Sequence, residues 1–155
     1  MALISRTRWM FGLFSLSLPF ACGNDNPPPP PLEQTGSSCS VAAVATDCYP
    51  SLDGAALMGG ARVCIDAVPG GYCTHLCAAD TDCCAVPGEC RTPYPQVCSP
   101  FESMAMKYCF LSCENSDLAD AGATDANAFC ATYAHAGLNC RSTGGGALNR
   151  KVCLP

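Results

Sequence analysis

The sequence has few charged and few aromatic residues for its length. Only 14% of its 155 residues are charged, and it has one tryptophan, two histidines and eight lysine and arginine residues. Large apolar residues are also sparse after the first twenty positions, so an aliphatic core alone is too small to hold a chain of this size. These shortages argue against a large α/β enzyme domain.

Basic residues are too few for a nucleic-acid-binding protein. Arg6 and Arg8 lie in a segment that we expect to be removed, which leaves six basic against 13 acidic side chains and a net charge of −7. Such a surface repels phosphate backbones and anionic membrane surfaces. We therefore expect no nucleic-acid partner.

Motifs for catalysis and for cofactor binding are also missing. The chain has no Gly-x-Ser-x-Gly, no Cys-x-x-Cys and no glycine-rich phosphate loop between a strand and a helix. Only His75 and His135 are available as a general base, and every cysteine has an explanation as a disulfide partner. We expect no enzyme activity, no catalytic residue and no cofactor.

Two metal-binding patterns do not meet the requirements of their sites. Cys73, His75 and Cys77 offer zinc ligands, but their spacing differs from a zinc knuckle and an oxidising compartment converts thiols to disulfides. His75 is therefore expected to be an exposed loop residue. Acidic residues at positions 80–82 and 115–125 offer oxygen ligands without EF-hand spacing. We expect no metal site.

The chain is rich in cysteine. Fifteen cysteines in 155 residues is close to the density of a short disulfide scaffold. Disulfides in such a chain replace part of the missing hydrophobic core. Because the number is odd, one cysteine must have a different role from the others.

The start of the chain predicts export. Residues 1–8 are short and basic, and residues 9–20 form an apolar run that suits a signal peptide but is too short to span a bilayer. No second apolar run of spanning length follows. We predict a signal peptide over residues 1–21.

Cys22 is the predicted exception among the cysteines. The stretch Leu18-Pro19-Phe20-Ala21-Cys22 resembles the lipobox of bacterial lipoproteins, in which the thiol is lipidated and signal peptidase II cuts before the cysteine. Lipidation of Cys22 would leave 14 cysteines, an even number. Pro19 and Phe20 depart from the usual lipobox, so cleavage by signal peptidase I, with Cys22 as one more disulfide partner, stays open as the alternative.

Residues 22–38 are predicted to form a tether. Five consecutive prolines at 27–31 favour a polyproline II spacer of roughly 15 Å. Gly36-Ser37-Ser38 predicts a flexible joint at its end. The expected membrane contact is therefore through the lipid on Cys22, with the rest of the chain held away from the bilayer.

Residues 39–155 are predicted to form one cysteine-rich domain with degenerate repeats. Three Val-Cys pairs, two Tyr-Cys-x3-Cys units and two Cys-Arg pairs recur along it. They divide the domain into 39–77, 83–113 and a truncated 130–153. All its cysteines are expected to form disulfides, in a pairing that the sequence leaves open: Cys39, Cys48, Cys64, Cys73, Cys77, Cys83, Cys84, Cys90, Cys98, Cys109, Cys113, Cys130, Cys140 and Cys153.

One block resembles a known type of module. Residues 71–83 read GYCTHLCAADTDC and are followed by Cys90 and Cys98. This pattern resembles the modules of cysteine-rich lipoproteins common in myxobacteria, which are loosely similar to the Dickkopf-type N-terminal cysteine-rich domain. The resemblance covers about Val63 to Cys98, and Cys84 departs from it. It implies location and architecture more than activity.

The predicted fold is a small disulfide-rich, loop-dominated domain with one or two short helices and little strand. Residues 99–102 (SPFE) have the form of a capping box, which predicts a helix with one face made by Phe101, Ala105, Tyr108 and Ser112. Asp125 is the expected N-cap of a second helix over 126–136, with Gly137 as its stop. Strands are expected only as short pieces around the Val-Cys pairs.

These features predict a non-catalytic envelope lipoprotein that acts as a disulfide-stapled interaction or structural module. It would face the periplasm or the cell surface of a bacterium, and its expected partners are envelope or extracellular proteins or glycans. The alternative is a secreted protease inhibitor or toxin-like effector. In that case residues 91–96 or Arg150-Lys151 would be the loops presented to a protease.

Overall fold

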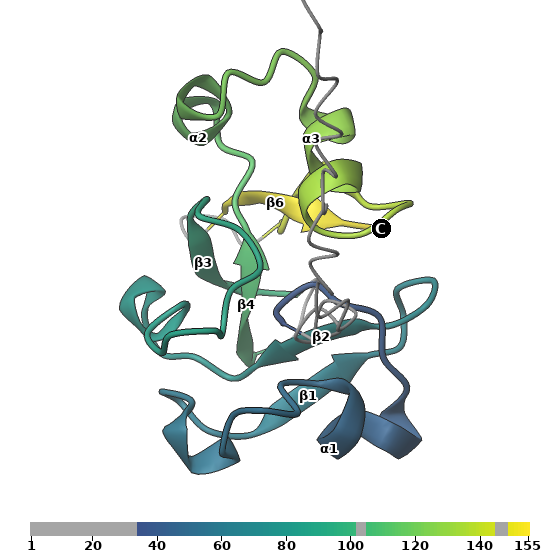
Figure 1. Ribbon diagram of the computed structural model, residues 1–155. Helices are drawn as coiled ribbons and strands as arrows, with labels where there is room; N and C mark the ends of the chain where they lie inside the picture. The colour runs from purple at the N-terminus through teal and green to yellow at the C-terminus, as the bar shows by residue number, and fades with distance from the viewer. Residues whose placement is uncertain (1–33, 102–104, 145–148) are drawn as a thin grey trace, which may run out of the picture.

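The computed structural model describes residues 34–101, 105–144 and 149–155, so the predicted signal peptide, Cys22 and most of the predicted tether lie outside the described residues. Three antiparallel hairpins form the frame (Figure 1). They pair β1 (Arg62–Ile65) with β2 (Tyr72–His75), β3 (Gln96–Pro100) with β4 (Lys107–Leu111), and β5 (Asn139–Ser142) with β6 (Lys151–Leu154).

The helices are short. The α-helices are α1 (Val44–Asp47), α2 (Asn115–Asp120) and α3 (Ala126–Tyr133), and the 3-10 turns are η1 (Val41–Ala43), η2 (Gly54–Ala56) and η3 (Asp80–Asp82). Within the described ranges, none of them has the length and apolar character needed to cross a membrane. The predicted small, disulfide-rich fold with few helices is confirmed, but it contains more strand than predicted.

Six of the seven disulfides of the described chain hold the hairpins to the segments that precede them. Each hairpin carries two cysteines directly opposite each other on its two strands, namely Cys64 and Cys73, Cys98 and Cys109, and Cys140 and Cys153. Each hairpin cysteine forms a disulfide with a cysteine that precedes the hairpin. In each set of four cysteines, the first pairs with the third and the second with the fourth. The bonds are 39–64 and 48–73, 77–98 and 83–109, and 113–140 and 130–153.

We call each such set of four cysteines with its hairpin a crossed-disulfide unit, numbered 1 to 3 along the chain. Bridges 77–98 and 113–140 join cysteines across the boundaries predicted from sequence. The reason is that Tyr-Cys-x3-Cys does not close a unit. Its first cysteine ends one hairpin and its second begins the next unit, as Cys73 and Cys77 do. Unit 3 therefore has four cysteines and is not truncated.

The three hairpins share one hydrophobic core. Isolated bridges join Leu76 to Tyr108 and Ser112 to Val152, so that β2, β4 and β6 contact one another in turn. Phe110 is fully buried at their centre, with its ring centroid 5.4 Å from that of Tyr72. Because this core is small, the disulfides are an important part of what holds the strands in place.

The helix predicted from the capping box at 99–102 is wrong. Pro100 pairs with Lys107 next to the loop that joins β3 to β4, and Tyr108 lies within β4. Bridges 77–98 and 83–109 fix both strands of this hairpin to the preceding segment. Tertiary pairing therefore overrides the local helix signal.

The second predicted helix is present as α3. The Asp125 carboxylate accepts hydrogen bonds from the amides of Asn127 and Ala128, as predicted for its N-cap. The helix ends at Tyr133, three residues before the predicted end, although Gly137 does adopt a positive φ of 93°. The short helix α2 was not predicted from the sequence.

Candidate functional site

A histidine–glutamate pair lies fully buried in the described part of the chain. His75 lies at the end of β2 and Glu89 in the loop between Cys84 and Cys90, and both side chains are 0% exposed. His75 Nε2 is 2.8 Å from Glu89 Oε1. The expectation that His75 is an exposed loop residue is therefore wrong, because strand β2 turns its side chain inward.

Glu89 is held as a carboxylate by three donors. The amides of Cys84 and Val86 donate to its two oxygens at 2.6 and 3.1 Å, and His75 supplies the third hydrogen bond. Burial raises the pKa of Glu89, but these hydrogen bonds outweigh that effect and bring the pKa below its ordinary value. The loop that carries Glu89 thus supplies two of the donors that keep it charged.

Both ring nitrogens of His75 face oxygen acceptors. Nδ1 is 2.8 Å from the carbonyl oxygen of Leu76, and Nε2 faces the Glu89 carboxylate. A carbonyl and a carboxylate can only accept, so both contacts are satisfied when each nitrogen carries a proton. The pair is then a buried imidazolium and carboxylate, which is costly to remove from water unless every hydrogen bond is made.

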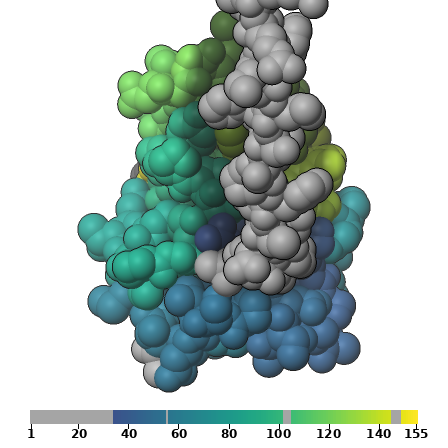
Figure 2. Space-filling view, in the orientation of Figure 1, coloured from purple at the N-terminus to yellow at the C-terminus, as the bar shows by residue number. Residues whose placement is uncertain are grey.

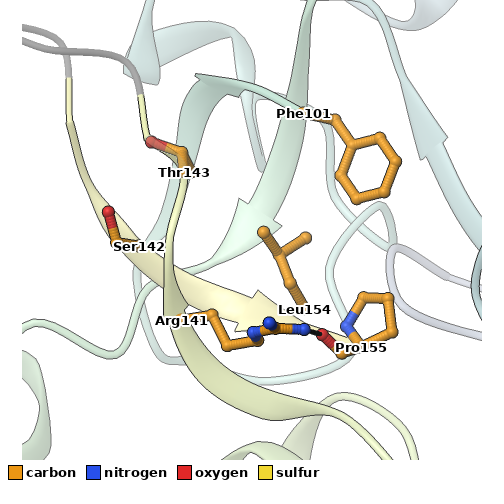
Figure 3. A pocket seen from close by; sticks show the side chains of 6 residues that line it. All are labelled: Phe101, Arg141, Ser142, Thr143, Leu154 and Pro155. Carbon is orange, nitrogen blue, oxygen red and sulfur yellow. Dashed lines mark hydrogen bonds between the residues drawn. The ribbon is translucent and has the colours of Figure 1, made fainter. Parts of the chain in front are cut away.

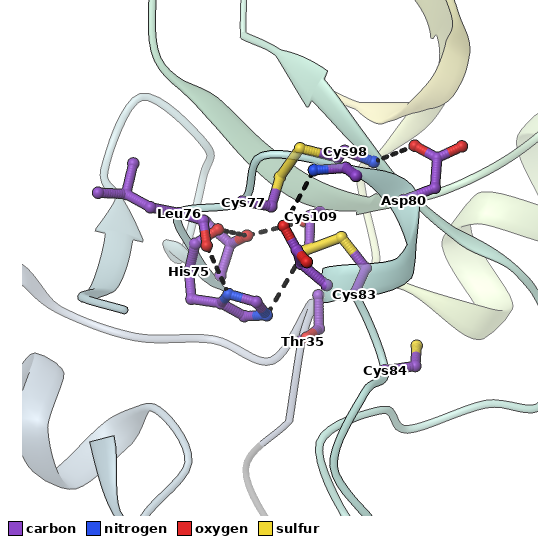
Figure 4. Close-up of a disulfide and its surroundings, with 12 residues drawn as sticks. Thr35, His75, Leu76, Cys77, Asp80, Cys83, Cys84, Cys98 and Cys109 are labelled. Carbon is purple, nitrogen blue, oxygen red and sulfur yellow. Dashed lines mark hydrogen bonds between the residues drawn. A yellow bond between two sulfur atoms is a disulfide. The ribbon is translucent and has the colours of Figure 1, made fainter. Parts of the chain in front are cut away.

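Disulfides surround this pair. Cys109 Sγ is 3.4 Å from His75 Nε2 and is bonded to Cys83, as Figure 4 shows. The next residue, Cys84, bonds to Cys90 and so closes the loop that holds Glu89. The Cys83-Cys84 neighbours therefore pair with different partners, one inside the fold and one at its surface.

Residues 34–39, which we call the covering segment, lie over the other side of the site. Its backbone pairs with β2, because the Gly36 amide donates to the Cys73 carbonyl and the Cys73 amide donates to the Ser37 carbonyl, each at 2.8 Å. Thr35 and Ser37 are 2% and 7% exposed. The predicted flexible joint at 36–38 is thus wrong, since this segment is part of the domain.

Thr35 joins the covering segment to the site. Its amide donates to the Glu89 carbonyl at 3.2 Å, and its hydroxyl is 2.6 Å from the hydroxyl of Tyr49. Burial raises the pKa of Tyr49, so this tyrosine stays neutral and forms a hydroxyl–hydroxyl hydrogen bond with Thr35. The Tyr49 ring meets the His75 ring edge-on, with centroids 5.9 Å apart.

The soft metal ligands considered from sequence are committed to other bonds. Cys73 and Cys77 form disulfides with Cys48 and Cys98. His75, Glu89 and Cys109 have donor atoms within 4.8 Å of one another, but Cys109 is already bonded to Cys83 and the other two bind each other. These groups are fully used in the oxidised protein.

The acidic residues that were candidates for cation binding hold backbone segments. The Asp82 carboxylate accepts hydrogen bonds from the amides of Ala79 and Ala78, which hold its pKa below the usual value. Asp80 accepts from the Cys98 amide and forms an ion pair with Arg150. Their contacts explain both residues as supports for η3 and β3.

A serine and a histidine also meet at the surface. Ser38 Oγ lies 2.7 Å from His135 Nε2, and Gly70 lies against the same ring. His135 Nδ1 is buried without a hydrogen-bond partner among the described residues, so no carboxylate orients the ring there as in a catalytic triad. The contact fastens the covering segment to the end of α3.

A small pocket lies between the ends of the second and third hairpins. Figure 3 shows its lining by Phe101, Arg141, Ser142, Thr143, Leu154 and Pro155. Its volume is about 220 Å³, below the usual range for small-molecule sites. The Arg141 guanidinium already donates to the carbonyl oxygen of Pro155.

The two loops considered for protease inhibition make contacts with neighbouring elements. Arg91 donates to the Ala134 carbonyl, and the Tyr94 ring lies against the rings of Phe129 and Tyr133, so residues 91–96 lie along α3. Arg150 forms ion pairs on both sides of its side chain, and Lys151 begins β6.

No protein-family model, curated protein or solved structure matches the chain. The site is a buried ion pair under a loop that one surface disulfide closes. The sequence analysis considered His75 only to expect it exposed, and it missed Glu89, which is 14 residues away and belongs to no recognisable motif. The one feature of the sequence that could have pointed to Glu89 is its position between Cys84 and Cys90, which are six residues apart and close a short loop.

Proposed function

We propose that the chain is a lipid-tethered, non-catalytic module of the bacterial envelope that binds an envelope or extracellular protein or glycan. The observation that carries the proposal is the pairing of all 14 cysteines after residue 38 with one another. Cys22, the one cysteine beside a lipobox-like sequence, is left over from this set. Seven disulfides also suit an oxidising compartment.

The packed covering segment supports a tether that ends earlier than predicted. Because Gln34 already donates to the Gly88 carbonyl, the spacer between lipid and domain is limited to residues 23–33. Its five prolines then precede the domain closely, so a stiff spacer would join the lipid to a fixed point near the loop that carries Glu89.

Intact mass spectrometry of the mature protein tests the anchor. We expect a diacyl or triacyl addition on Cys22, seven disulfides, and a shift of the protein to the soluble fraction in Cys22→Ser. Asn26→Ala is the matched control, because it changes the same segment and keeps the thiol. An unlipidated N-terminus with Cys22 oxidised would contradict the proposal.

A surface for the partner is available beside α3. A hollow of about 310 Å³ lies between the α2–α3 connection and α3, with Tyr133, Thr132 and Asp125 among its lining residues. Tyr133 is 36% exposed although its ring also packs on Phe129. In Figure 2, α2 and the residues after it stand out at the top of the visible face. Half-exposed aromatic rings with polar neighbours suit both proteins and glycans.

Capture from solubilised envelope with the full chain tests the binding role. We expect a protein or glycan to be retained by the native chain, and at least about tenfold less by Tyr133→Ala, since loss of an aromatic anchor costs more than about 1.4 kcal/mol. Val41→Ala is the control, because Val41 is also exposed but lies on η1. Equal capture by both variants would exclude this surface, and no capture at all would contradict the binding role.

A further inference from the structure

One disulfide stands apart from the repeated frame. Six of the seven bridges form the crossed-disulfide units, and each hairpin is held by two of them. Cys84–Cys90 is additional, and it spans only six positions. All three hairpins would keep both of their bridges if it were opened. The frame therefore does not require this bond.

Cys84–Cys90 is also the most accessible bridge. Cys84 is exposed and Cys90 is half-buried. In each of the other six disulfides at least one cysteine is buried. Thiol–disulfide exchange requires a thiolate to approach along the S–S axis, so accessibility is a first condition for reduction.

The backbone at Cys84 is held in an unfavourable conformation. Its φ is +63°, and Tyr49 is the one other non-glycine residue of the described chain with a positive φ. A residue with a Cβ atom is disfavoured in this region, and such strain persists only where the surroundings enforce it. Opening the bridge would let this residue return to an ordinary conformation.

The same bridge closes the loop over the buried ion pair. The amides of Cys84 and Val86 donate to the Glu89 carboxylate, which in turn bonds His75. The loop also holds the covering segment, since the Gly88 and Glu89 carbonyls accept from Gln34 and Thr35. A change in the backbone at Cys84 would therefore alter the contacts of the His75–Glu89 pair and those of Gln34 and Thr35 in the covering segment.

We propose that Cys84–Cys90 is a thiol–disulfide exchange site that opens the loop over His75 and Glu89 when a dithiol reductant acts on it. A thiolate of the reductant attacks Cys84 Sγ, and the Cys90 thiolate leaves and takes up a proton. The second thiol of the reductant then displaces Cys84 as a thiol. The protein gains two thiols and the reductant becomes a disulfide. The proposal does not depend on the lipid anchor.

The test is stepwise reduction of the full chain under native conditions. The protein is treated with increasing dithiothreitol, alkylated, and mapped by peptide mass spectrometry under conditions that keep the other bridges. We expect Cys84 and Cys90 to be alkylated at a concentration at least about tenfold below that needed for any other cysteine. First reaction at Cys39, Cys77 or Cys140, which are half-buried, would overturn the assignment.

Hydrogen exchange tests the opening itself. After selective reduction we expect the Cys84 and Val86 amides to exchange at least about tenfold faster, while amides in β4 stay protected. Unchanged protection at Cys84 and Val86 would overturn the opening.

Cys84→Ser/Cys90→Ser gives the same comparison without reductant. We expect it to fold with six disulfides and to show the fast exchange of the reduced protein. Cys77→Ser/Cys98→Ser is the matched control, because it removes a bridge of unit 2 and should lose protection in β3 and β4. If the first variant loses the hairpins as the second does, the bond belongs to the frame and the proposal is overturned.

Discussion

Glu89→Ala is expected to lower the free energy of unfolding by about 3 to 5 kcal/mol, the usual cost of removing one partner from a buried ion pair. The side chains of His75 and Glu89 are both 0% exposed, so the substitution leaves the His75 ring buried without its carboxylate partner. The substitution also leaves the Cys84 and Val86 amides without their acceptor. Equilibrium unfolding in guanidinium, with the disulfides intact and far-UV circular dichroism as the readout, measures the change.

Glu114→Ala is the control for this experiment. Glu114 forms an ion pair with Arg150 at 3.7 Å, but its side chain is 35% exposed, so we expect a loss of about 1 kcal/mol or less. Equal effects of Glu89→Ala and Glu114→Ala would contradict the view that the buried pair is a major support of the fold.

The stability contributed by Glu89 should depend on pH in a definite direction. Its pKa in the folded chain lies below the ordinary value of 4.5, because hydrogen bonds from His75, Cys84 and Val86 outweigh the effect of burial. Its contribution is therefore present above about pH 4.5 and is lost as the pH falls through the lower folded value. Asp82 acts in the same direction, so the difference between the native chain and Glu89→Ala isolates the contribution of Glu89.

The sequence predicted the positions of the strands better than their arrangement. The Val-Cys pairs at Cys64, Cys98 and Cys153 do lie in β1, β3 and β6, because a β-branched residue beside a buried cysteine suits a short strand. Asp125 was correctly identified as a helix cap because its signal is local. Local sequence patterns were therefore sufficient to predict elements that are stabilised by interactions between neighbouring residues.

Local patterns gave wrong predictions where contacts between residues far apart in the sequence decide the structure. The capping box at 99–102 is a genuine helix signal, but the Cys98 and Cys109 bridges commit both of its flanks to a hairpin. Ser37 and its neighbours have the composition of a linker, yet their backbone completes hydrogen bonds of β2. Glu89 meets His75 from a loop that bridge 84–90 closes. In each case the interaction that decides the local structure is made with a residue far away in the sequence, so a local pattern does not reveal it.

Gly71→Ala is expected to lower the free energy of unfolding by about 3 to 4 kcal/mol, or to prevent correct oxidation of unit 1. Gly71 has a φ of +74°, which alone costs an alanine about 1 kcal/mol. A Cβ atom there would also lie against the Cys39 carbonyl oxygen, far inside van der Waals contact, and 2.9 Å from Cys39 Sγ. Relief requires movement of a backbone that is fixed by bridge 39–64, which adds about 2 to 3 kcal/mol.

Gly122→Ala separates the two contributions. Gly122 has a similar φ of +64°, but a Cβ atom there would meet nothing within 4 Å. We therefore expect it to lose only the backbone term, about 1 kcal/mol, and to form all seven bridges. Guanidinium unfolding gives the difference, and peptide mapping of the oxidised variants shows whether Cys39 still reaches Cys64. Equal losses in the two variants would mean that the close approach of Gly71 to Cys39 does not constrain the fold. A larger loss in Gly71→Ala would show that bridge 39–64 fixes the covering segment against the first hairpin.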